Sequence, residues 1–238
     1  MSIIKLFELE IDKKLTNQYL SNLENLIKNN DYILGESVRT FETEFSNFLS
    51  SNYSVAVNSG TDALEISLRL LDISKGDEVI VPAFTFYATT EVILKVGAKP
   101  VFCDIDSKFL TLDIRKLEDL ITKKTKAIIP VHLFGNSANL QAIRKTLKTV
   151  NHKIHIIEDV AQAFGSKFNN KYLGTIGEFG CFSFYPTKNL GAFGDGGALT
   201  FRNKKYLSRA RILRNHGMTK KYFHSEIGYN SRLDNFQA

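Results

Sequence analysis

The chain of 238 residues is 43% hydrophobic and 24% charged, an ordinary globular composition with enough residues for one large domain or two small ones. No apolar run reaches the length of a membrane span and the first residues contain no secretory signal pattern, so we expect a cytoplasmic protein that binds no membrane. The formal net charge of +6 permits an anionic partner, but no binding motif or interleaving of basic with aromatic residues supports nucleic acid as that partner.

The first predicted elements are two amphipathic helices. One carries Val38, Phe41, Phe45 and Phe48 on a single face, and the other covers residues 60–73. Both predict apolar faces that pack against a core.

From residue 77 onward, short apolar runs alternate with amphipathic segments. The runs predict strands at 77–84, 99–106, 125–135, 153–160, 179–186 and 197–203. The segments between them predict helices at 90–97, 113–125 and 137–150. Nearly continuous apolar strands that alternate with helices indicate an open, mostly parallel sheet covered by helices.

Two cysteines, Cys103 and Cys181, fall within predicted strands. They are too few for a disulfide framework and lack the spacing of zinc ligands. We expect both to be small buried residues, and we predict no metal site.

Basic residues are concentrated at 202–224, where Lys and Arg recur at helical spacing. A solvated helix face is the favoured interpretation, an anionic small substrate the second, and nucleic acid a remote third. His216 and the run 204–221 are candidates for contact with a diphosphate, although we expect most of these side chains to face solvent.

The last residues predict the beginning of a helix, because Leu233 and Phe236 are three positions apart. Ala238 follows them without a cap or a stop signal. We therefore expect a fragment of a longer protein or the product of a split gene.

Three features are typical of a ligand site, and each has an ordinary alternative. In "NSGTDAL", Gly60 and Thr61 begin a helix whose N-terminus suits a phosphate, although capped helices commonly begin this way. In "HIIEDVAQAFGS", Asp159 ends a strand at the edge where open α/β sheets bind ligands, although capping a following helix is equally plausible. Ser183 can donate to an anion, although a serine satisfied by backbone is the commoner case.

A fourth feature is Lys188, which follows an aromatic run in "SFYPTKNLG" and precedes a glycine-rich loop. A surface lysine is the default interpretation. Desolvation by the apolar neighbours is expected to lower the lysine pKa from its usual value of about 10.4 and make the neutral amine a nucleophile. The glycines are expected to let a bulky ligand approach the backbone. Together these features predict a Schiff-base lysine and a phosphate-bearing aldehyde cofactor.

The ordered motifs of the chain resemble those of the DegT/DnrJ/EryC1/StrS family from about Gly35 to the last residue. They are "NSGTDAL", "PAFTFYATTEVILKVGAKPVFCDID", "PVHLFGN", "IEDVAQAFGS", "SFYPTKNLGAFGDGGAL" and "IGYNSRLDNFQA". The resemblance implies a pyridoxal-phosphate-dependent sugar aminotransferase with the α/β fold of aspartate aminotransferase (fold type I). It implies a large, cofactor-binding domain at 37–238 with a mostly parallel sheet between helices, preceded by an N-terminal segment at 1–36. The family's C-terminal small domain is missing from these residues, so we do not expect full activity from them alone.

The resemblance also implies roles for individual residues. Lys188 matches the lysine that holds the cofactor covalently and, once freed, moves a proton between the substrate carbon and the cofactor. Asp159 matches the carboxylate that pairs with the pyridine nitrogen and keeps the ring electron-withdrawing. Gln162 matches the amide near the phenolic oxygen of the ring, and Phe86 matches the aromatic side chain that stacks on its face.

The remaining matches concern the cofactor phosphate. Gly60, Thr61 and Ser183 match the phosphate cradle. Asn230, in "GYNSR", matches a residue that reaches the phosphate of the neighbouring subunit. The resemblance therefore implies a homodimer with shared active sites.

The implied reaction moves an amino group, usually from glutamate in this family, to a nucleotide-linked keto-sugar in amino-deoxy sugar biosynthesis. Relatives that dehydrate sugars at C3 carry histidine where this chain has Lys188, so lysine favours transamination. The alternative is a truncated or non-catalytic paralogue that acts as a binding or regulatory protein. Lys188 and Asp159 argue against this alternative, and the missing C-terminal domain argues for it.

Overall fold

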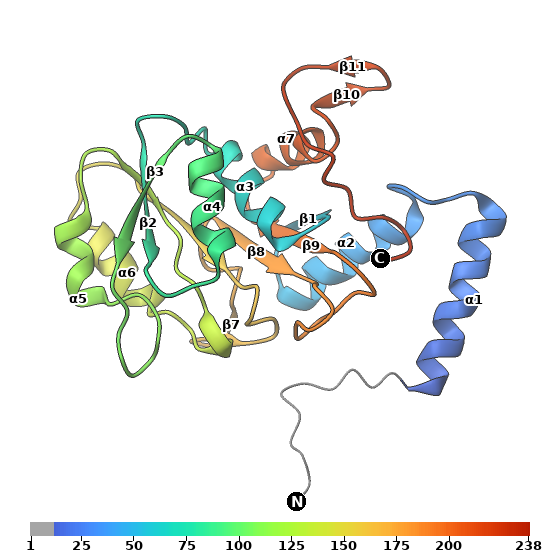
Figure 1. The fold of residues 1–238 in the computed structure, drawn as a ribbon, viewed down its shortest axis with the longest axis horizontal. Coiled ribbons are helices and arrows are strands. Elements are labelled where there is room, and N and C mark those ends of the chain that lie inside the picture. The colour runs from blue at the N-terminus through green and yellow to red at the C-terminus, as the bar shows by residue number, and fades with distance from the viewer. Residues whose placement is uncertain (1–11) are drawn as a thin grey trace, which may run out of the picture.

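The computed structural model describes residues 12–238, which are built around a seven-stranded sheet in the order β1-β9-β8-β5-β4-β2-β3 (Figure 1). The strands are β1 (Tyr53–Val57), β2 (Glu78–Pro82), β3 (Lys99–Cys103), β4 (Thr125–Ile128), β5 (His155–Asp159), β8 (Phe179–Ser183) and β9 (Gly197–Phe201). Neighbouring strands from β3 to β8 are parallel, whereas β9 runs antiparallel to both β8 and β1. The expected mostly parallel sheet is confirmed.

All six predicted strands are present, each within its predicted range. Strand β1 was not predicted as a strand, and it pairs with β9 at the edge of the sheet. Two short hairpins were also missed. They are formed by β6 (Lys167–Phe168) with β7 (Lys171–Tyr172), and by β10 (Met218–Lys220) with β11 (Phe223–His224).

Seven α-helices lie in the described part of the chain. They are α1 (Lys13–Asn29), α2 (Glu36–Leu49), α3 (Gly60–Leu70), α4 (Tyr87–Lys95), α5 (Ile114–Leu117), α6 (Leu140–Leu147) and α7 (Lys205–Leu213), with 3₁₀ turns at Glu118–Leu120 and Leu133–Gly135. None of these helices, within residues 12–238, combines the length and apolar character needed to cross a membrane.

The helix predicted at 113–125 is wrong over its second half. Only α5 and one 3₁₀ turn form, because threonine side chains form hydrogen bonds with the backbone N–H groups that follow. The Thr125 hydroxyl accepts from the N–H of Thr122, and the Thr122 hydroxyl accepts from the N–H of Lys124 and donates to Glu78. Such local hydrogen bonds compete with helix formation.

The basic run at 202–224 is only in part a solvated helix face. Helix α7 ends at Leu213, and the β10–β11 hairpin follows. Arg214 is buried and donates to Glu42, which also accepts from Arg211. Arg209 pairs with Asp72 and Glu226. These arginines therefore hold the fold together.

Helices cover both faces of the sheet. One apolar cluster joins α3, α4 and α7 to side chains such as Val79 and Val81, and the other joins α2, α5 and α6 to the opposite face, which includes Ile80. This alternation follows the two-residue period of a strand. Cys181 lies in the first cluster and Cys103 in the second, and both are buried and free, as predicted.

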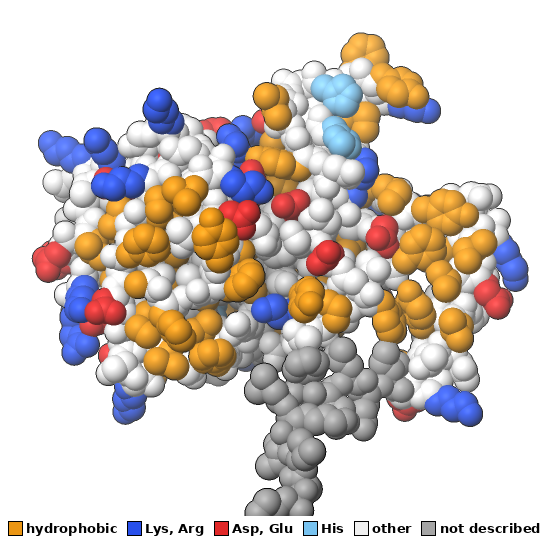
Figure 2. Space-filling view, in the orientation of Figure 1, with side chains coloured by type: hydrophobic (Ala, Val, Ile, Leu, Met, Phe, Trp, Pro, Cys, Tyr) orange, Lys and Arg blue, Asp and Glu red, His pale blue; other side chains and the backbone are white. Residues whose placement is uncertain are grey.

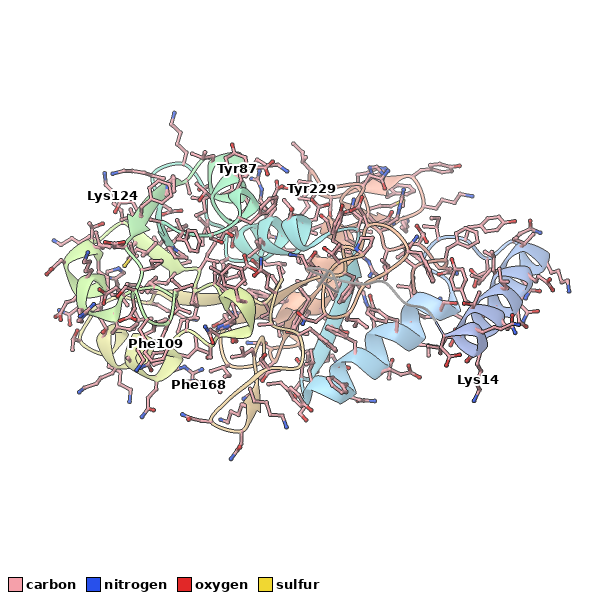
Figure 3. All side chains as sticks on the ribbon, turned by 60° about the horizontal axis from the view of Figure 1, so that its bottom comes forward. Lys14, Tyr87, Phe109, Lys124, Phe168 and Tyr229 are labelled. Carbon is pink, nitrogen blue, oxygen red and sulfur yellow. The ribbon has the colours of Figure 1, made fainter. Side chains whose placement is uncertain are left out.

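Helix α1 stands apart from the sheet and buries none of its side chains (Figure 1). Figure 3 shows Lys14, near its start, at the far end of the molecule from α5 and α6. The end of the chain lies against the segment that follows α1, where Asn235 accepts from the N–H of Gly35 and donates to the carbonyl of Asp31. The boundary between 1–36 and 37–238 stays a prediction, and residues 1–11 lie outside the described part.

The last residues form one helical turn. The N–H of Ala238 donates to the carbonyl of Asp234, and the Asp234 carboxylate accepts from the N–H of Gln237. This is the arrangement expected where a helix begins.

Candidate active site

A cavity of about 550 Å³ lies where the carboxyl ends of β5 and β8 meet the first turns of α3 and α4. Ligands bind at this edge in open α/β sheets. Seven of the eight predicted site residues line it: Gly60, Thr61, Phe86, Asp159, Gln162, Ser183 and Lys188.

The N-terminus of α3 forms one end of the cavity. Ser59 caps the helix by accepting from the N–H of Asp62. The N–H groups of Gly60 and Thr61 belong to the first turn, where a helix offers no partner of its own. A Cβ on Gly60 would lie 2.7 Å from the Cβ of Ser183, so glycine lets the helix end approach the serine closely. Free N–H groups, the helix dipole and a hydroxyl together suit an anion.

Asp159 lies on the cavity wall and is only 5% exposed. Its carboxylate accepts from the N–H of Ala161 at 3.1 Å and from the hydroxyl of Thr89 at 2.9 Å. Burial raises the pKa of Asp159, and these two hydrogen bonds oppose that rise only in part. A protonated ring nitrogen in the cavity would stabilise the ionised carboxylate, so this residue fits such a ligand.

The alternative in which Asp159 caps a following helix is wrong, because a turn follows β5. The side chain does accept the backbone N–H two residues onward, as in an Asx turn. The same carboxylate therefore fixes the turn and lines the cavity.

Lys188 is half-buried on the cavity wall and forms no ion pair with any residue from 12 to 238. Its loop is closed at the base, where Phe184 donates to the carbonyl of Gly196 and Ala192 donates to that of Phe184, each at 2.7 Å. The amine is therefore held at the cavity without a carboxylate partner.

Two glycines of this loop have a steric use that was not predicted. A Cβ on Gly191 would lie 2.5 Å from the carbonyl oxygen of Pro186, and a Cβ on Gly197 would overlap the backbone of Ser59. Both glycines make room for other parts of the chain. Gly196 of the same loop lines the cavity, and the predicted approach of a ligand to the backbone of this loop stays a prediction.

Gln162 and Phe86 complete the predicted set. The Gln162 side-chain oxygen accepts from the N–H of Phe134 at 3.0 Å, which leaves its NH₂ group as a donor. Phe86 is the N-cap of α4, is 72% exposed and lines the cavity, so its ring is accessible to a planar ligand.

Asn230 is the one predicted residue that does not line the cavity. It is exposed, its backbone pairs with Asn215, and its carbonyl accepts from the side chain of Asn58 at 3.3 Å. A role at the phosphate of another subunit stays a prediction.

Sequence reasoning missed Thr89, which is 1% exposed and donates to Asp159. Its hydroxyl also lies 2.9 Å from that of Thr85. The two threonines are four residues apart in "TFYATT", a spacing that brings side chains together at the start of a helix. Tyr185 and Asp195 are further lining residues that were not singled out.

The cavity therefore combines an anion site at one end, a buried acid, an amide donor and an unpaired amine. This set suits a planar ligand that carries an anionic group, a basic ring nitrogen and a carbonyl group that the amine can attack.

Comparison with known proteins adds a family. The sequence profile of the DegT/DnrJ/EryC1/StrS aminotransferase family matches residues 13–238, so the match begins earlier than the resemblance suggested. The chain is 45% identical over 224 residues to a UDP-N-acetyl-3-dehydro-alpha-D-glucosamine 3-aminotransferase of Acidithiobacillus ferrooxidans, covering 94% of this chain and 60% of that protein.

Two solved structures support the same relationship. The structure of S. venezuelae DesV in complex with a ketimine intermediate superposes with a TM-score of 0.90 and 40% identity, covering 94% of this chain and 60% of that one. NtdA from Bacillus subtilis with bound cofactor PMP superposes with a TM-score of 0.90 and 32% identity, covering all of this chain and 55% of that one. The chain thus spans about 60% of the length of the relatives that it matches first.

Proposed function

The chain belongs to the DegT/DnrJ/EryC1/StrS aminotransferase family, and from this premise we propose that the whole protein is a pyridoxal-phosphate-dependent sugar aminotransferase. It transfers an amino group to a nucleotide-linked keto-sugar in amino-deoxy sugar biosynthesis. The observation that best supports this proposal is the single cavity lined by Lys188, Asp159 and the N-terminus of α3.

The residues present fit pyridoxal phosphate. Gly60, Thr61 and Ser183 would hold its phosphate, because they combine free helix N–H groups with a hydroxyl. Asp159 would pair with the ring nitrogen, whose positive charge offsets the burial of the carboxylate. Gln162 would donate to the phenolic oxygen.

The reacting groups of the chain are Lys188 and Asp159. Bound pyridoxal phosphate supplies an electron sink for the bond changes at the substrate carbon. The Nζ of Lys188 would hold the cofactor between turnovers and, once free, would move a proton between the substrate carbon and the cofactor. Asp159, whose carboxylate accepts from the Thr89 hydroxyl, would pair in its ionised form with the ring nitrogen. A lysine at 188 supports transamination over dehydration.

The substrate class follows from the relatives. The protein of A. ferrooxidans is named for a UDP-linked dehydro-glucosamine, which is a nucleotide-linked keto-sugar. We propose this class for the present protein, with glutamate as the amino donor. The cytoplasm is the proposed compartment, which agrees with two free cysteines.

A homodimer with shared sites is also part of the proposal. Large apolar side chains on and around β3 and α4 are exposed to solvent, and one of them, Phe86, lines the cavity: Phe84, Phe86, Tyr87, Leu94 and Phe102. Figure 2 shows apolar side chains gathered over this part of the surface. Patches of this kind commonly mark protein interfaces. Tyr229, next to Asn230, lies on the same side of the molecule as Tyr87 in Figure 3, so a partner covering this side would approach Asn230.

Borohydride reduction of the complete protein tests the covalent role of Lys188. After loading with pyridoxal phosphate, reduction and digestion, mass spectrometry is expected to find the cofactor on the peptide that contains Lys188. A cofactor bound elsewhere, or none bound, contradicts the assignment. Incubation with glutamate and a panel of nucleotide-linked keto-sugars then identifies the acceptor, and sedimentation velocity tests the dimer.

A further inference from the structure

Glu158 precedes Asp159 on β5, so its side chain lies on the opposite face of the sheet, and it is fully buried. The carboxylate accepts from the N–H groups of Ile176 at 2.8 Å, Gly177 at 2.6 Å and Gly174 at 2.9 Å. The proposed mechanism assigns no role to this buried acid.

His132 provides a fourth donor and is also fully buried. Its Nδ1 lies 3.1 Å from the backbone N of Ala138, whose hydrogen requires a lone pair on that ring nitrogen. The ring therefore carries its proton on Nε2, which lies 3.1 Å from Oε2 of Glu158 and donates to it. All four donors converge on one carboxylate without a cation.

The backbone of His132 is joined to Asp159 as well. The N–H of His132 donates to the carbonyl of Asp159, and the N–H of Asp159 donates to the carbonyl of Pro130, both at 3.0 Å. His132 therefore contacts both residues at the end of β5, one through its side chain and the other through its backbone.

The residues on either side of His132 shape the cavity. Val131 and Leu133 line it, and the N–H of Phe134 holds the side chain of Gln162. Phe134 has a φ of 54°, a left-handed conformation that costs free energy in a residue other than glycine. Such a turn persists only where neighbouring contacts hold it.

We propose that His132 and Glu158 form a buried positioning pair that holds the wall 131–134 and the backbone of Asp159 in place for the cofactor. The pair acts from the face of the sheet opposite to Asp159, and neither side chain touches the ligand. This inference deepens the proposed function and rests on it for the identity of the ligand.

Two substitutions in the complete protein separate the bond to Glu158 from the volume of the ring. In His132→Gln, the side-chain NH₂ can occupy the place of Nε2 and still donate to Glu158. In His132→Asn, the side-chain oxygen can still accept from Ala138, but the side chain is too short to reach Glu158. Loss of a hydrogen bond to a charged group predicts a rise in the pyridoxal phosphate Kd of about tenfold or more for His132→Asn and about threefold or less for His132→Gln.

Amide hydrogen exchange of the cofactor-free protein is a second readout, independent of activity. Exchange at Gly174, Ile176 and Gly177 is expected to be about tenfold faster in His132→Asn than in His132→Gln. Wild-type binding by His132→Asn, or equal losses in both variants, overturns the proposal. If His132→Asn does not fold, Glu158→Asp, which keeps the charge but withdraws it from these amides, is expected to show the same two effects, and wild-type behaviour overturns the proposal. A wild-type protein that binds no cofactor refutes the proposed function, whereas the exchange measurement still decides on the pair.

Discussion

Replacing Thr89 by valine tests how the cavity keeps Asp159 ionised. Valine has the shape of threonine and fits a side chain that is 1% exposed, but it removes the hydroxyl 2.9 Å from the Asp159 carboxylate. Burial already raises the pKa of Asp159, and the loss of this donor raises it further. A ring nitrogen that carries a proton pairs with the ionised carboxylate. In Thr89→Val, cofactor binding must therefore supply more free energy to ionise Asp159.

The magnitude follows from the two protonation states of Asp159. A hydrogen bond stabilises a charged group by about 1.5–3 kcal/mol and a neutral one by about 0.5–1.5 kcal/mol. The difference of about 1–1.5 kcal/mol corresponds to a pyridoxal phosphate Kd that is roughly five- to twelvefold higher in Thr89→Val.

Fluorescence titration of the cofactor-free, complete protein measures this effect. Thr89→Ser keeps the hydroxyl and is expected to bind like the wild type. Thr85→Val is the matched control, because the Thr85 hydroxyl contacts the Thr89 hydroxyl and is connected to the Asp159 carboxylate only through it. Equal Kd values for Thr89→Val and the wild type, or equal losses for Thr89→Val and Thr85→Val, would refute the reasoning.

Three further predictions concern stability. His155, whose Nδ1 lies 3.4 Å from the Glu178 carboxylate, and the Tyr206 hydroxyl, which donates to it, lower the pKa of Glu178 to about 2. The contribution of Glu178 to stability is therefore present above the unfolded-state pKa of about 4.5 and is lost as pH falls toward 2. Glu178→Gln should flatten the pH dependence of urea unfolding in this window. Asp159 has a raised pKa, so the free energy of unfolding of the cofactor-free protein should fall as pH rises above the ordinary aspartate range. Asp159→Asn should remove that fall. An unchanged pH profile in this variant would contradict the prediction. Glu42→Ala leaves the buried Arg214 without its carboxylate partner and should lower the free energy of unfolding by about 3–5 kcal/mol. Arg211→Gln removes only the half-exposed partner of Glu42 and should lower it by about 1 kcal/mol or less.

Six of the seven strands of the sheet could be predicted from short apolar runs, and β2, β8 and β9 among them are buried along almost their whole length. Helix α1 was missed although Leu15, Tyr19, Leu23 and Leu26 recur at helical spacing, and the structure buries none of its side chains. The end of the helix predicted at 113–125 depended on hydroxyls that bond to the backbone, which a pattern of apolar spacing does not register.

The candidate site could be predicted because several features of the sequence converge on it. Lys188 and Asp159 each had an ordinary alternative when considered alone, and the ordered family motifs decided between the two interpretations. Thr89, His132 and Glu158 could not be singled out from sequence, because their meaning lies in partners from distant segments. The donors to Glu158 come from residues 16 to 26 positions away along the chain.

Gly197 shows how the topology of the sheet limits the site. Strand β9 lies between β1 and β8, yet α3, which follows β1, must reach Ser183 at the end of β8 to complete the anion site. The start of α3 therefore passes over the first residue of β9, and a Cβ there would overlap the backbone of Ser59. Glycine at 197 and glycine at 60 together bring the helix N–H groups to Ser183. Strand β9 fits between β1 and β8 at the cavity only because residues 60 and 197 lack side chains. The glycine that begins α3 and the last glycine of the run after Lys188 therefore meet the same steric requirement.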